Sequence, residues 1–138
     1  MAPSLLIDLR PAVGGHGQRG IGRYVRGLAA SIATFPDELA DRIWATGFPG
    51  PTLDSFGSRA VTLTARRGLG RAPTWATGRL DATAALRRSG ARVLHATDPQ
   101  QPWTGSAFSS IVTVYDLIPL HERAILQSWR LDQQLIYR

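Results

Sequence analysis

The chain alternates short apolar segments with glycine- and proline-rich loops and with segments of helical period, and this order most constrains its fold. The apolar segments that we expect to be strands cover residues 5–10, 42–46, 60–64, 92–96 and 110–115. Apolar residues at helical spacing predict helices over residues 22–34, 79–89 and 122–137. Short, mostly apolar strands are typical of parallel sheets that are buried on both faces. The order βαββαββα therefore predicts an α/β fold, with an open, mostly parallel sheet and helices on both faces.

Length and composition limit the class of protein further. The 138 residues suit one domain, and a hydrophobic content of 43% is enough for a core. The absence of cysteine excludes disulfides and cysteine-ligated metals. The N-terminal apolar run stops at Asp8, which is too early for a signal peptide. The longest uncharged stretch, residues 99–115, is broken by proline, glycine and polar residues and does not suit a membrane span. We therefore expect one soluble, cytoplasmic domain.

The net charge of +6 has two interpretations, and every basic residue behind it is arginine. A polyanionic partner is one of them, whether nucleic acid, anionic lipid or a phosphorylated substrate. The other is a set of charges spread over a solvated surface. Arg66, Arg67 and Arg71 lie close together in the sequence, but no helix carries a basic stripe with interleaved aromatic residues. The second interpretation is therefore favoured, and no nucleic-acid partner is expected.

Residues 15–20 match the pattern GxGxxG between a predicted strand and a predicted helix. A dinucleotide site needs the first glycine at the end of the strand and an acidic residue at the end of the second strand. Here Gly15 lies well beyond Arg10, and the second strand ends without an acidic residue, so we reject that site. Gly20 and Gly22 still stand at a helix start, where free backbone amides can receive a phosphate or a sugar hydroxyl. A plain flexible turn explains the same residues, and both alternatives stay open.

Polar residues follow the fourth and fifth predicted strands, at the edge where an open α/β sheet binds its ligands. Asp98, Tyr115 and Asp116 can accept hydrogen bonds from sugar hydroxyls, and Tyr115 can also donate one. The two aspartates equally suit turns, because each precedes a proline within three residues. His95, within an apolar strand, is more typical of a core histidine than of a catalyst. The scattered histidines predict no metal site.

Four segments together resemble the N-terminal half of a family 4 glycosyltransferase of GT-B architecture. They are residues 7–11 (IDLRP), 19–24 (RGIGRY), 93–95 (VLH) and 112–119 (VTVYDLIP). The likeness is to the bacterial enzymes that build cell-surface polysaccharides, and it covers nearly the whole chain. It implies a Rossmann-like fold, with residues 1–138 forming the acceptor-side domain. A C-terminal domain, absent from this sequence, would bind most of the nucleotide-sugar.

The resemblance also implies roles for single residues. Gly20, Gly22 and Arg23 would approach the donor phosphates, and Asp98 would lie near the sugar. Tyr115 stands where many relatives have a histidine that contacts the transferred sugar, so Tyr115 and Asp116 become the catalytic candidates. The family retains anomeric configuration and uses neither a metal nor a cofactor, so positioning and charge stabilisation would carry the catalysis.

The function expected from this resemblance is transfer of a sugar from a nucleotide-sugar to a glycan or lipid-linked acceptor, with the isolated chain inactive. The alternative is a stand-alone α/β domain that binds a phosphorylated or anionic ligand. Residues 65–78, with three arginines and Trp75, predict an exposed loop on the acceptor side. Such a loop suits either plain solvation or contact with a phosphate-bearing lipid at the inner face of the membrane.

Overall fold

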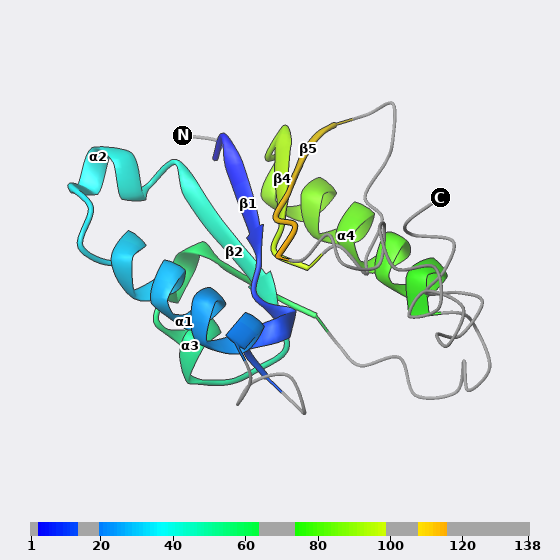
Figure 1. Cartoon of the computed structure of the whole chain (residues 1–138). Coiled ribbons are helices and arrows are strands. Elements are labelled where there is room, and N and C mark those ends of the chain that lie inside the picture. Colours follow the sequence, from blue (N-terminus) through cyan, green and yellow to red (C-terminus); the bar gives the residue numbers. More distant parts are fainter. Residues whose placement is uncertain (1–2, 14–19, 64–73, 99–107, 116–138) are drawn as a thin grey trace.

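The computed structural model describes residues 3–13, 20–63, 74–98 and 108–115, with the backbone alone for residues 74–79 (Figure 1). These residues form a five-stranded sheet in which every neighbouring pair of strands is parallel. Its strands are β1 (Leu5–Asp8), β2 (Ile43–Gly47), β3 (Ala60–Thr62), β4 (Val93–Ala96) and β5 (Ser109–Val112). Their order across the sheet is β3-β2-β1-β4-β5. The chain therefore has the open, Rossmann-like α/β fold that the sequence predicts.

The strand order reverses its direction at β1. The chain moves outward from β1 through β2 to β3, then returns past β1 to β4 and β5. Leu6 lies between Trp44 of β2 and Leu94 of β4, which sets the register on both sides. In open α/β sheets the crevice at such a reversal, outside the carboxyl ends of the strands, is where ligands bind. The fold thus places the ends of β1 and β4 at the expected binding edge.

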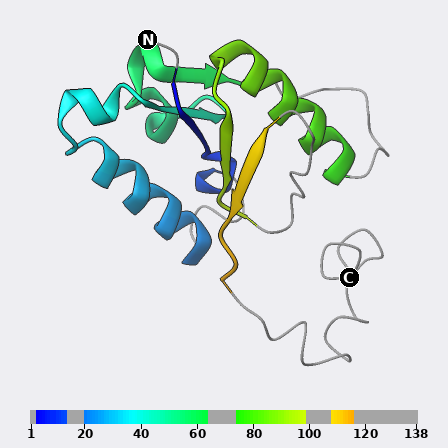
Figure 2. The same cartoon turned by 90° about the horizontal axis from the view of Figure 1, so that it is seen from above.

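Helices α1 (Gly20–Ile32) and α4 (Thr74–Ser89) lie on opposite faces of the sheet (Figure 2). The remaining helical segments are short: α2 (Asp37–Ala40), α3 (Pro51–Asp54), η1 (Arg10–Ala12) and η3 (Gly57–Arg59). Gly90 ends α4 with a φ of 74°, and its amide donates to the carbonyl of Leu86. This left-handed glycine is the C-terminal cap that stops the helix.

Alternating side chains of β1 supply the two halves of the core. Leu6 packs with Leu86 of α4 and Leu94 of β4. Ile7 points to the other face and packs with Val25 and Ala29 of α1. Successive side chains of a strand point to opposite faces, so a fully apolar strand is what a sheet covered twice requires. The continuous apolar run of β1 follows from this position at the centre of the sheet.

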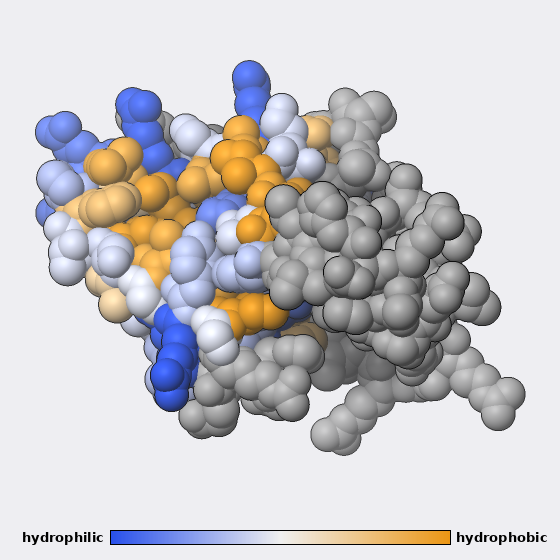
Figure 3. Space-filling view, in the orientation of Figure 1, coloured by the Kyte–Doolittle hydropathy of each residue, from blue (hydrophilic) through white to orange (hydrophobic). Residues whose placement is uncertain are grey.

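Strand β5 forms one edge of the sheet, and all of its side chains are exposed. This differs from the mostly buried strand that its apolar composition indicates. Exposed Ile111 and Val112 belong to opposite faces, because they pair with His95 and Ala96 of β4. Elsewhere apolar side chains also reach the surface in the region of α1, β1 and β2 (Figure 3).

The observed helix bounds correct the prediction from the sequence in two places. The expected loop over residues 65–78 is wrong for Thr74–Gly78, because α4 already begins at Thr74. A single internal glycine, Gly78, costs a helix only about 1 kcal/mol, and the remaining turns offset that cost. Helix α1 begins at Gly20, two residues before the predicted start. The predicted helix over residues 122–137, like Arg66, Arg67 and Arg71, lies outside the described residues.

Candidate functional site

The candidate site is the carboxyl edge of the sheet where β1, β4 and β5 end beside the first turns of α1 (Figure 1). Polar groups there are buried, in contrast to the apolar strands that lead to them. Asp8 closes β1 at 1% exposed, and Thr97 and Asp98, just past β4, are 0% and 7% exposed. Buried polar groups cost free energy unless they are hydrogen-bonded, so their partners determine what this edge does.

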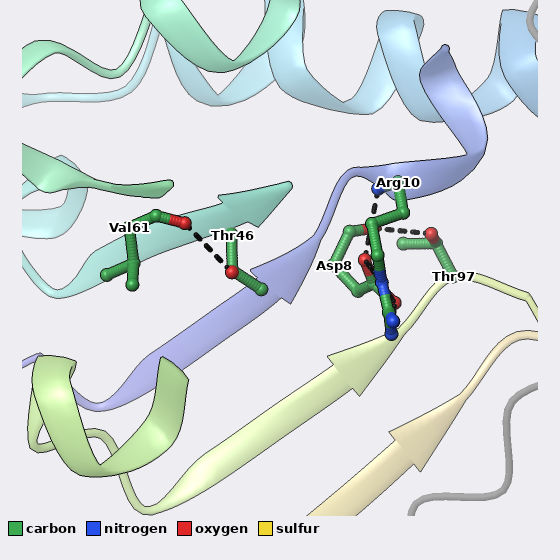
Figure 4. A network of polar contacts seen from close by, with 5 residues as sticks. All are labelled: Asp8, Arg10, Thr46, Val61 and Thr97. Carbon is green, nitrogen blue, oxygen red and sulfur yellow. Dashed lines mark hydrogen bonds and ion pairs between the residues drawn. The ribbon is translucent and has the colours of Figure 1, made fainter. Parts of the chain in front are cut away.

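A buried ion pair joins Asp8 to Arg10 (Figure 4). Arg10 Nε donates to Asp8 Oδ1 at 2.9 Å, and Nη2 donates to Oδ2 at 2.7 Å. The backbone amide of Arg10 also donates to Asp8 Oδ1 at 3.0 Å. Two parallel bonds to one carboxylate are the geometry that a guanidinium favours, and they hold the turn after β1 in one conformation.

Thr97 connects β4 to β1 at the point where the strand order reverses. Its hydroxyl donates to the backbone carbonyl of Asp8, and both residues are buried (Figure 4). On the far side of β1, the amide of Leu9 donates to the carbonyl of Thr46 at 2.7 Å. The hydroxyl of Thr46 in turn donates to the carbonyl of Val61 at 2.9 Å. Two threonine hydroxyls and one backbone amide thus link neighbouring strands at their carboxyl ends.

Tyr115 connects β5 to the same edge. It lies beyond the end of β5, and its hydroxyl donates to the backbone carbonyl of Thr97. Its ring meets Tyr24 of α1 edge to face, with 5.3 Å between the ring centroids and 80° between the ring planes. The hydrogen bonds from Tyr115 to Thr97 and from Thr97 to Asp8 form a continuous connection from β5 to β1. Two segments more than ninety positions apart in sequence are thereby held together.

The environment of Tyr115 keeps its phenol neutral. Burial raises its pKa most, and the neighbouring Tyr24 and the negative charge of Asp98 raise it further. The proton of the hydroxyl is already committed to the carbonyl of Thr97. A general base or nucleophile would need the phenolate. The side chain is therefore suited to positioning and to ring contacts.

His95 lies in β4, one residue before the carboxyl end of the strand. Its Nε2 lies 2.8 Å from Oγ1 of Thr113, in the segment after β5. Burial lowers the pKa of His95, and the charge of Asp8 opposes this in part. The neutral imidazole is thus the form that suits the fold, but His95 is half-buried and does not belong to the buried core.

This direction of the shift predicts a pH dependence of stability. An unfolded histidine takes up a proton near pH 6.5, whereas folded His95 does so only at lower pH. The contribution of neutral His95 is therefore complete above about pH 6.5 and is lost as the pH falls through its folded-state pKa. We expect the free energy of unfolding of wild type to fall between pH 7.5 and pH 5 more steeply than that of His95→Gln. Denaturant unfolding at both pH values checks this, and equal losses would contradict it.

The structure brings some of the predicted site residues together. Asp98 and Tyr115 both lie at the carboxyl edge, close enough for the charge of Asp98 to raise the pKa of Tyr115. Gly20, Gly22 and Arg23 form the first turn of α1 rather than a loop, with Gly22 buried and Arg23 exposed. Asp116 lies outside the described residues.

Several residues of this edge were not among the sequence candidates. Asp8 ends an otherwise apolar strand, and Arg10 follows it at the spacing that allows a local ion pair. This charged pair directly after a buried strand was the available signal. Tyr24 ends the segment RGIGRY of the family resemblance, which gave it no role of its own. Thr97 had no signal, because a threonine past a strand is common in any α/β chain.

The described part of the chain holds no cluster of three or more His, Asp or Glu side chains that could bind a metal ion. Among the same residues, no helix is both long enough and apolar enough to cross a membrane.

Comparison of the chain with protein-family models, curated proteins and solved structures finds no match.

Proposed function

We propose that this chain is the acceptor-side domain of a retaining glycosyltransferase, which moves a sugar from a nucleotide-sugar to a glycan or lipid-linked acceptor. The partner domain in such an enzyme is a second Rossmann-like domain that binds most of the donor. The reaction needs neither a metal nor a cofactor. The acceptor is met at the cytoplasmic side of the membrane.

One observation carries the proposal: the segments behind the family resemblance converge on one edge of the sheet. Asp8 and Arg10 come from the first segment, Tyr24 from the second and Tyr115 from the fourth. Thr97, directly after the strand of the third segment, bonds to Asp8 and receives the bond from Tyr115. Residues that share one role at a strand-end crevice would be expected to meet there.

The roles of single residues follow from their places. Asp98 is the carboxylate that accepts hydrogen bonds from sugar hydroxyls, and Asp116 is a catalytic candidate on the family resemblance alone. Tyr115 acts as a positioning residue, since its phenol stays neutral and its proton is bonded to Thr97. The first turn of α1, with Gly20 and Gly22, offers backbone amides to the donor phosphates and has no acidic side chain to repel them.

The test is a transfer assay with the full-length protein and a panel of nucleotide-sugars, with bacterial membrane extract as the source of acceptor. We expect release of the nucleoside diphosphate that depends on the extract, and a product that retains the anomeric configuration of the donor. An Asp98→Asn variant should release the diphosphate at least about tenfold more slowly.

Two results would count against a transferase. Diphosphate release that ignores the extract would indicate simple hydrolysis of the donor. Micromolar binding of sugar phosphates by this chain, with no release from any donor, would favour the alternative of a stand-alone domain for phosphorylated ligands.

A further inference from the structure

Two large aromatic side chains remain half-exposed at the carboxyl edge of the sheet. Tyr24 is 40% exposed and Tyr115 is 37% exposed, although their rings contact each other. They come from different elements, one from α1 and the other from the segment after β5. Exposed aromatic surface at the carboxyl edge of an open α/β sheet is typical of a binding site, because a ligand that covers it removes apolar surface from water.

Both rings are held in place before any ligand arrives. The hydroxyl of Tyr115 is fixed by its bond to Thr97, and its ring is fixed by the edge-to-face contact with Tyr24. Tyr24 precedes Val25, which is fully buried against the sheet and anchors this turn of α1. A surface that is already ordered loses little conformational entropy on binding.

The groups around the two rings determine which ligand suits them. Asp98 is buried at the same edge of the sheet, and its charge reaches the phenol of Tyr115. The face of an aromatic ring carries partial negative charge, which attracts the polarised C–H groups on the flat side of a pyranose. Carboxylate oxygens accept hydrogen bonds from the hydroxyls around the rim of the same sugar. An acyl chain would use the rings but not the carboxylate.

We infer that Tyr24 and Tyr115 form a stacking platform for an uncharged pyranose ring of the acceptor glycan. That the sugar belongs to the acceptor glycan rests on the proposed function. The platform itself rests only on the rings, their exposure and the neighbouring carboxylate.

The test uses methyl pyranosides as probes, because they carry neither phosphate nor nucleotide. Binding of the methyl α-glycosides of glucose, galactose and mannose to the full chain is followed by NMR, through the ring signals of the tyrosines. We expect at least one glycoside to bind in about the millimolar range. Tyr24→Phe and Tyr24→Trp should keep this affinity, whereas Tyr24→Leu should weaken it about fivefold. The matched control is Phe35→Leu, because Phe35 is an aromatic residue of similar exposure that no contact joins to Tyr115 in the described structure.

Three results would overturn the inference. They are a Tyr24→Leu variant that binds like wild type, a wild type that binds none of the glycosides, and a uridine or guanosine monophosphate that shifts the tyrosine signals more strongly than any glycoside. The Phe and Trp variants keep the test valid if Tyr24→Leu unfolds, since loss of binding in both would also contradict a platform. Glycoside binding without sugar transfer would instead reject the transferase and leave the platform standing.

Discussion

Replacing Asp8 by alanine is expected to lower the free energy of unfolding by about 3–5 kcal/mol, the usual cost of removing one partner of a buried ion pair. The carboxylate is 1% exposed and receives both side-chain bonds of the Arg10 fork and the amide of the same residue. Without it, a guanidinium that is 8% exposed loses the carboxylate with which it forms a buried ion pair. Denaturant unfolding of the two proteins, compared at equal slope, measures the difference.

Two further variants separate the ion pair from a general effect of lost charge. Asp41→Ala removes an exposed carboxylate and should change the free energy of unfolding by no more than about 0.5 kcal/mol. The double variant Asp8→Leu, Arg10→Met should recover part of the loss, because it removes both charges of the pair and leaves neither of them buried without the other. If Asp8→Ala and Asp41→Ala cost the same, the pair at the end of β1 contributes little to the fold.

The fold could be predicted because its signals are local and repeated. Residues 5–10 and 92–96 are mostly apolar, and such short apolar runs are typical of strands in a parallel sheet that is covered on both faces. The cap at Gly90 could be predicted for the same reason, since few residues other than glycine suit a left-handed helix end. The start of α4 could not, because residues 74–78 contain a glycine and lack helical period, while the helix that follows extends through them.

The exposure of β5 could not be predicted either. Whether an apolar strand is central or at the edge depends on which strands pair, and pairing is a long-range property. The order β3-β2-β1-β4-β5 puts β5 outermost, although its sequence has the same character as β4.

The candidate site shows the same division. Asp98 and Tyr115 could be named from their places after strands, and both lie at the carboxyl edge. Their connections could not, because the bond from Tyr115 to Thr97 and the contact with Tyr24 join positions 18 and 91 apart in the sequence. Such contacts follow from topology, and no local pattern of residues announces them. The sequence predicted that the carboxyl edge is the binding edge, and the hydrogen bonds that join its residues were seen only in the structure.

Replacing Gly22 by valine is expected to lower kcat/KM for sugar transfer by at least about 100-fold, or about 2.7 kcal/mol, in the full-length protein. Gly22 is buried in the first turn of α1, at the end that faces the carboxyl edge of the sheet. If this turn binds the donor phosphates as proposed, a branched side chain there would keep them from the backbone amides. The added bulk should also cost the fold about 1–3 kcal/mol, as overpacking does in general.

Gly27→Val is the matched control for that experiment, since it makes the same chemical change on the same helix. Gly27 is exposed, and a Cβ added there would meet no atom of the described structure within 4 Å. It should therefore leave kcat/KM within about twofold of wild type. The free energy of unfolding should stay within about 0.5 kcal/mol of wild type. Gly22→Ala, with a smaller side chain, should fall between the two valine variants in activity while staying folded. If Gly22→Val and Gly27→Val have equal activity, the start of α1 is a plain turn and takes no part in binding the donor.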